Sequence, residues 1–121
     1  MNYFPDFRQT ESKDCGPSCL KIIGKFYNRT FDMNYLREVC ETTREGSSAY
    51  GLCNGAEVLG FRAIAATTNI ETFEEEDIFP CIVHWDNFHF VVVYRISKRW
   101  VYVSDPAFGL LKYTKEEFVE H

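Results

Sequence analysis

The sequence predicts an α+β fold in which N-terminal helices pack on a C-terminal antiparallel sheet. Up to about residue 60 the apolar residues recur at helical spacing, whereas beyond it they form short extended blocks separated by turn residues. Because helices and strands occupy separate parts of the chain, an α+β architecture is favoured over an alternating one. A chain of 121 residues is enough for one hydrophobic core, so we expect residues 1–121 to form a single domain.

Charge and composition exclude several classes of protein. The formal net charge is −5 and no stripe of Lys and Arg is present, which argues against a nucleic-acid partner. No apolar run approaches the ~20 residues that a transmembrane helix needs, and the charged N-terminal segment is unlike a signal peptide. Five cysteines without paired spacing indicate reduced thiols in a cytosolic setting instead of a disulfide framework.

Three helices are expected in the first half of the chain. The first spans about 17–27 and the second about 33–41, with Asp32 as the N-cap of the second. The third spans about 50–59, and Gly60 supplies the left-handed residue that ends it.

The second half is expected to form the sheet. The connection 67–77 contains a short helical turn, and Thr114 with Glu117 forms a capping box for a final helical turn. The longest apolar block, 89–96, is expected to be a central strand because it is apolar almost throughout. The predicted strands span 61–66, 81–85, 89–96, 100–104 and 110–113.

Cys15 is the candidate nucleophile. Gly16 permits a sharp bend and Pro17 suits the first turn of a helix, so Cys15 is expected at the N-terminus of the first helix. The N–H groups and the dipole at such a position favour a thiolate, and they lower the thiol pKa from its ordinary ~8.5 by up to several units. The alternative is a small buried residue that only begins a helix.

A cysteine nucleophile needs a base, and the chain has three histidines. His89 opens the central strand and Asp105 closes the next strand, so an in-register hairpin places both at one end of the sheet. A carboxylate there orients the imidazole while the other ring nitrogen faces a thiol. His84 is the rival base, although a structural role is more usual for a histidine in mid-strand, and the terminal His121 is expected to be frayed.

Gln9 completes the candidate set, since a side-chain amide six residues ahead of the thiol can turn back and donate to an oxyanion. Asp105 precedes Pro106 and has the alternative reading of a simple turn residue. Taken together, Gln9, Cys15, His89 and Asp105 on a helices-then-sheet chain favour a papain-like cysteine protease.

Four segments resemble the N-terminal peptidase domain of peptidase-containing ABC exporters, the double-glycine leader peptidases that process bacteriocins. They are QTESKDCGPSCL at 9–20, SSAYGLCNGAEVLGFRA at 47–63, FHFVVVY at 88–94 and VSDPAFG at 103–109. The resemblance implies a papain-like fold with Cys15 as nucleophile, His89 as general base, Asp105 as its orienter and Gln9 as oxyanion donor. It also implies cleavage of a precursor peptide after a Gly-Gly or Gly-Ala pair, coupled to export.

The resemblance further implies a location at the cytoplasmic face of the bacterial inner membrane, beside the membrane and nucleotide-binding parts of an exporter. No cofactor is expected in this domain, because ATP would bind only in a transporter portion and the chain has no G-x-x-x-x-G-K-[ST] loop. No metal site is expected either, since Cys15 and Cys19 lack the C-x-x-C spacing. Both an excised exporter domain and a free-standing papain-like peptidase or acyltransferase fit the sequence, and a leader-binding module without cleavage is a further alternative.

Cleavage after two glycines requires a narrow cleft, because the substrate offers little side chain near the scissile bond. Affinity is then expected from an apolar groove that takes one face of an amphipathic leader helix. The expected walls of the cleft are Ser48, Ala49, Tyr50, Gly51, Asn87 and Phe88.

Overall fold

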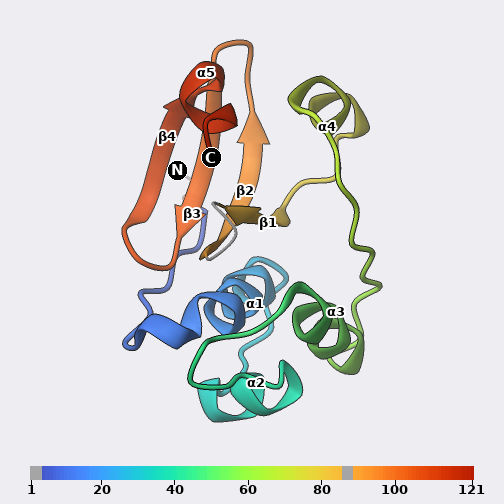
Figure 1. Cartoon of the computed structure of the whole chain (residues 1–121), viewed down its shortest axis with the longest axis vertical. Helices are drawn as coiled ribbons and strands as arrows, with labels where there is room; N and C mark the ends of the chain where they lie inside the picture. The colour runs from blue at the N-terminus through green and yellow to red at the C-terminus, as the bar shows by residue number, and fades with distance from the viewer. Residues whose placement is uncertain (1–3, 86–88) are drawn as a thin grey trace.

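The computed structural model describes residues 4–85 and 89–121. Figure 1 shows α1, α2 and α3 gathered in one half of the molecule, with the sheet and α5 in the other. The elements are η1 (Ser12–Asp14, a 3-10 turn), α1 (Cys15–Phe26), α2 (Met33–Val39), α3 (Ala49–Val58), α4 (Ile70–Glu76), β1 (Cys81–Trp85), β2 (His89–Ile96), β3 (Trp100–Asp105), β4 (Gly109–Thr114) and α5 (Lys115–Val119). Within the described residues, no helix is both long and apolar enough to span a bilayer.

The helix starts follow from local side-chain hydrogen bonds. Asp32 accepts from the backbone N–H of Tyr35, which confirms it as the N-cap of α2. Ser48 caps α3 by accepting from Gly51, and Thr114 with Glu117 forms the predicted capping box of α5.

Helix α1 begins two residues earlier than expected, at Cys15 itself. Pro17 therefore occupies the third helical position. Its missing N–H is still among the first four that have no partner inside a helix, so the proline is tolerated there.

The sheet is antiparallel throughout, in the order β1-β2-β3-β4, which confirms 89–96 as an inner strand. Alternate residues of β2 serve two cores: Phe90 and Val92 pack with the helices, whereas Val91 and Val93 pack in a second cluster with β3. An inner strand buried on both faces must be apolar almost continuously. This double burial explains the run of apolar residues that the sequence shows at 89–96.

The predicted strand at 61–66 is wrong. The segment 61–69 has no regular secondary structure and is not part of the four-stranded sheet. Phe61 and Ala63 turn toward the helical core while Ile64 is 83% exposed, so the residues alternate as in a strand. The alternation thus reflects one-sided packing on α3, where the Ala63 N–H donates to Glu57 at 2.7 Å, instead of sheet pairing.

Candidate active site

Cys15 is the first residue of α1 and is buried, as the sequence predicts. The loop ahead of α3 lies against the residue that follows it, because a Cβ placed on Gly16 would come 3.2 Å from the Cβ of Ser47. The thiol also receives hydrogen bonds from the His89 side chain and from backbone groups of Phe90 and Gly16. The start of α1 and β2 therefore meet at this sulfur, and the loop before α3 lies against the next residue, Gly16.

His89 and Asp105 lie at one end of β2 and β3, where the sequence places them. His89 Nε2 is 2.8 Å from Asp105 Oδ1. The same oxygen accepts the backbone N–H of Ala107 at 2.7 Å, so the turn after β3 fixes the carboxylate. Because Nε2 is engaged by Asp105, Nδ1 is the ring nitrogen that remains for Cys15.

Electrostatics favour a charged pair at this site. The hydrogen bond from Asp105 is the main cause that raises the His89 pKa from 6.5 to about 9, and the hydrogen bond with Cys15 adds to it. Burial acts to raise the pKa of the Cys15 thiol, but the hydrogen bonds from His89 and Phe90 outweigh it and bring that pKa below its ordinary value of 9.0. Both shifts favour the thiolate–imidazolium pair, which is the reactive form of a cysteine nucleophile.

Gln9 forms hydrogen bonds both to the turn after β3 and to the segment that precedes Cys15. Its backbone N–H donates to the carbonyl of Pro106 at 2.9 Å, and its side-chain Nε2 donates to the carbonyl of Glu11 at 3.0 Å. A carboxamide nitrogen carries two hydrogens, and the second contact of Nε2 is a long one, at 3.5 Å, to the carbonyl of Ser12. The Oε1 of Gln9 is buried and has no hydrogen-bond partner in the described part of the chain.

Sequence reasoning missed the partner of Asp14. This carboxylate is completely buried and receives two hydrogen bonds from Arg37 of α2, at 2.9 and 2.7 Å. The acid beside Cys15 was visible in the sequence, but no local spacing pairs it with a residue of the next helix.

The residues predicted to wall the cleft divide into three groups. Ser48 and Gly51 shape the start of α3, since a Cβ on Gly51 would lie 2.5 Å from the carbonyl oxygen of Cys40. Tyr50 is 74% exposed and Ala49 lines a groove described below, so both are open to a ligand. Asn87 and Phe88 lie outside the described residues.

The other two histidines both contact aromatic rings. The ring of His84 stacks on Phe90 at 4.3 Å, on the helix side of β1. His121, expected to be frayed, instead lies 4.2 Å from the Trp85 ring, so that prediction is wrong. Trp85, His121 and Phe108 help to line a cavity of about 340 Å³ beside His89 and Asp105.

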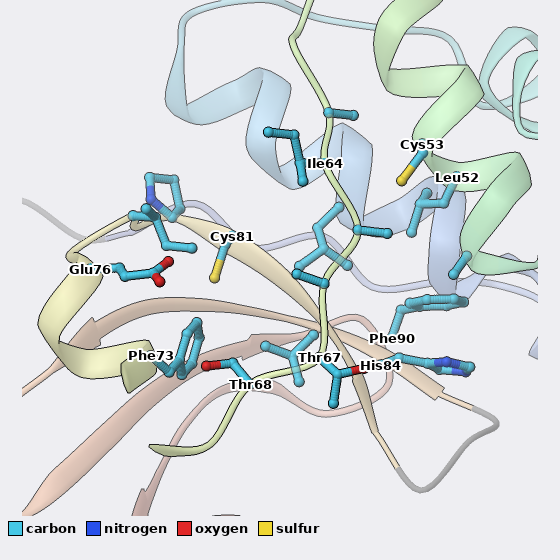
Figure 2. A pocket seen from close by; sticks show the side chains of 18 of the residues that line it. Leu52, Cys53, Ile64, Thr67, Thr68, Phe73, Glu76, Cys81, His84 and Phe90 are labelled. Carbon is cyan, nitrogen blue, oxygen red and sulfur yellow. The ribbon is translucent and has the colours of Figure 1, made fainter. Parts of the chain in front are cut away.

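A large groove of about 1260 Å³ lies between α1, α3, the segment 61–69, α4 and β1, and Phe90, the neighbour of His89, also lines it. Figure 2 shows that Leu52 and Cys53 of α3 face Cys81 and Phe73 across it, with Ile64 on the segment between. Its lining is mainly apolar, and it reaches the strand that bears His84. No group of three or more metal-ligating side chains occurs in 4–85 or 89–121, and all five cysteines are free thiols.

Comparison with known proteins defines the class of protein to which this site belongs. The model of the Peptidase C39 family matches residues 4–121, and the chain belongs to this family of cysteine peptidases. Its fold is papain-like, as predicted, because it superposes closely on solved C39 peptidase domains.

The relatives among characterised proteins are processing transporters. The chain is 37% identical over 115 residues to the lactococcin-G-processing and transport ATP-binding protein LagD of Lactococcus lactis subsp. lactis. It is 32% identical over 113 residues to the colicin V secretion/processing ATP-binding protein CvaB of Escherichia coli. These alignments cover 91% and 93% of this chain but only 16% of each relative.

Two solved structures match nearly the whole chain. A double glycine motif protease from an AMS/PCAT transporter, in complex with the leader peptide, gives a TM-score of 0.92 at 32% identity. That alignment covers 96% of this chain and 83% of the other. The peptidase domain of Streptococcus ComA, a bifunctional ABC transporter of a quorum-sensing pathway, gives 0.91 at 27% identity and covers 98% and 92% of the two chains.

Proposed function

We propose that this protein is a cysteine endopeptidase that removes a leader peptide after a Gly-Gly or Gly-Ala pair from a precursor destined for export. The observation that carries the proposal is the contact of Cys15 with His89, whose other ring nitrogen is held by Asp105 at 2.8 Å. Membership of the Peptidase C39 family and similarity to a double glycine motif protease give the substrate class.

In the proposed reaction the Cys15 thiolate attacks the carbonyl carbon of the second leader glycine and forms a C–S bond. His89, as imidazolium, gives its proton to the leaving amine of the mature peptide, and the C–N bond breaks. The imidazole then takes a proton from water, whose oxygen attacks the thioester and releases the leader with a free carboxylate. Asp105 keeps the ring in one orientation, and Gln9 donates to the oxyanion that forms at each tetrahedral stage.

Specificity for two glycines would come from steric exclusion at the cleft. The contact between Gly16 and Ser47, at 3.2 Å for an added Cβ, supports this, because it brings the loop before α3 against the residue next to the nucleophile. A small residue at the scissile bond fits such a cleft and a β-branched residue does not. Tyr50, Asn87 and Phe88 are proposed as further walls.

Affinity for the precursor would come from the groove of about 1260 Å³ beside the cleft. Its apolar lining from α3, 61–69 and β1 fits one face of an amphipathic helix. The double glycine motif protease that superposes on this chain was solved in complex with a leader peptide, which supports the same substrate here.

The proposed partners are the membrane and nucleotide-binding parts of an ABC exporter, at the cytoplasmic face of the inner membrane. The support is that the relatives are processing and transport ATP-binding proteins, of which this chain spans 16% of the length. ATP would bind to those parts and no cofactor would be needed for the cleavage itself.

The test uses a synthetic precursor with an amphipathic leader that ends in Gly-Gly, and a second in which the last glycine is Val. Mass spectrometry should show a single cut after Gly-Gly, no cut after Gly-Val, and nearly equal affinity for both peptides. Unfolded casein should remain intact. Digestion of casein or of the Val peptide would favour a general protease, and transfer of the leader to an added amine would favour an acyltransferase. Binding of both peptides without cleavage would identify a leader-binding module.

A further inference from the structure

Arg37 of α2 forms hydrogen bonds and ion pairs with the 3-10 turn η1, which leads directly into Cys15. Its Nε and Nη2 donate to the two carboxylate oxygens of Asp14, at 2.9 and 2.7 Å, and Nη2 lies 3.5 Å from Glu11 Oε2. A two-pronged bond between guanidinium and carboxylate fixes the orientation of both groups as well as their separation. The position of the turn is therefore set by a side chain from another helix.

The same turn also receives the side chain proposed as the oxyanion donor. The carbonyl of Glu11 accepts both the Nε2 of Gln9, at 3.0 Å, and the backbone N–H of Asp14, at 3.1 Å. A shift of the turn would therefore move Gln9 and the residue preceding Cys15 together.

Asp14 occupies the N-cap position of α1 and yet caps nothing. An aspartate there ordinarily accepts the N–H of the second or third helical residue, whereas the carboxylate of Asp14 bonds to no N–H of α1. Arg37 holds it instead, in a place where Asp14 is fully buried and the Arg37 side chain is only 24% exposed. Without Arg37 the buried carboxylate must find other donors, and an aspartate at the N-cap can accept from the unpartnered N–H groups at the start of its helix.

We infer that Arg37 is a positioning residue for the proposed cleavage: through Asp14 it sets the turn that carries Gln9 and Cys15. Its contacts are with Asp14, Glu11 and Asn34, and it keeps a negative charge from capping the helix at the nucleophile. The expected effect of Arg37 on turnover rests on the proposed function, whereas its expected effect on the pKa of the Cys15 thiol does not.

The test compares Arg37→Met and Arg37→Lys with Asn34→Ala. The last variant is the matched control, because it removes the 2.8 Å bond from Arg37 Nη1 without touching the turn. Two readouts are needed: kcat and KM on the synthetic Gly-Gly precursor, and the pH dependence of Cys15 alkylation by iodoacetamide, resolved by site with mass spectrometry.

Arg37→Met should lower kcat by about 10- to 100-fold, the usual scale for misplacement of reacting groups, and change KM by less than about twofold. Its alkylation midpoint should move to higher pH, since a carboxylate that caps α1 disfavours the thiolate. Arg37→Lys should give a kcat and an alkylation midpoint between those of wild type and Arg37→Met, because lysine keeps the positive charge but cannot bond to both carboxylate oxygens as the guanidinium does. Asn34→Ala should behave as wild type in both assays.

Melting temperatures separate this role from simple stabilisation. If Arg37→Met melts earlier but keeps the wild-type kcat and alkylation profile, Arg37 only stabilises the fold and the inference is wrong. If Arg37→Met does not fold, Arg37→Lys must show the same two changes, and a wild-type profile for it overturns the inference. If the wild-type protein does not cut the precursor, the proposed function fails, while the alkylation profiles still decide the role of Arg37.

Discussion

The two regions that the proposed reaction needs are built in opposite ways. Around Cys15 the polar side chains are buried and held by short bonds, such as 2.8 Å between His89 and Asp105. The groove beside it has a wall, 61–69, with no regular secondary structure, and Ile64 on that wall is 83% exposed. Chemistry needs fixed distances, whereas recognition of a helix tolerates a wall that adjusts, and segments with few buried contacts are the ones that open most readily. The two regions should therefore respond differently to substitution, in turnover at one and in affinity at the other.

The largest expected effect is at the nucleophile. Cys15→Ala should abolish cleavage because no thiolate remains, while leader affinity, measured by calorimetry on the synthetic precursor, should be unchanged. Cys19→Ala is the matched control, since Cys19 lies one turn further along α1 and is fully buried. Equal turnover by Cys15→Ala and wild type would refute the assignment of the nucleophile.

Loss of the base should be the next largest effect. His89→Ala should lower kcat by about 10²–10⁴-fold, the usual contribution of general acid–base catalysis, with KM nearly constant. His84→Ala serves as control for kcat, because the His84 ring lines the groove, stacks on Phe90 and lies on the face of the sheet opposite to that of His89. If His84→Ala proved inactive and His89→Ala active, the roles drawn from the strand register would be reversed.

The pH profile should report the same charged pair. His89 has a pKa raised to about 9, so kcat/KM should fall as pH rises through that value and the imidazolium loses its proton. On the acid side it should fall as pH drops through the lowered pKa of Cys15 and the thiolate is protonated. Asp105→Asn removes the main cause of the raised His89 pKa, so the alkaline limb should move to lower pH. An unmoved alkaline limb would assign that limb to another group.

The smallest expected effect is at the groove. Ile64→Asp places a charge on its apolar wall and should raise KM for the precursor about tenfold, which corresponds to the ~1.5 kcal/mol gained by burying such a side chain. The kcat value should stay near that of wild type. Val58→Asp is the control, because Val58 is also exposed, at 60%, and does not line the groove. Equal effects from both variants would mean that the leader binds elsewhere.

Much of the fold was predictable because its signals are local. Asp32, Ser48 and Thr114 form caps with donors three residues ahead, and such bonds depend only on neighbouring sequence. The bounds of β1 and β2 were predicted to the residue, since a Pro precedes one and an apolar block defines the other. The placement of His89 and Asp105 at one end of the sheet followed from the antiparallel pairing of β2 with β3.

What the sequence by itself determined is the placement of the thiol at a helix start and of its two partners at neighbouring strand ends, because both follow from periodicity and turn chemistry along the chain. Only the tertiary structure decided the rest. The segment 61–66 alternates like a strand but packs on α3, since pairing depends on what lies beside an edge strand and not on alternation alone. The hydrogen bond between Arg37 and Asp14 could not be predicted from the sequence either, because it joins residues of different elements that meet only when α2 packs on α1.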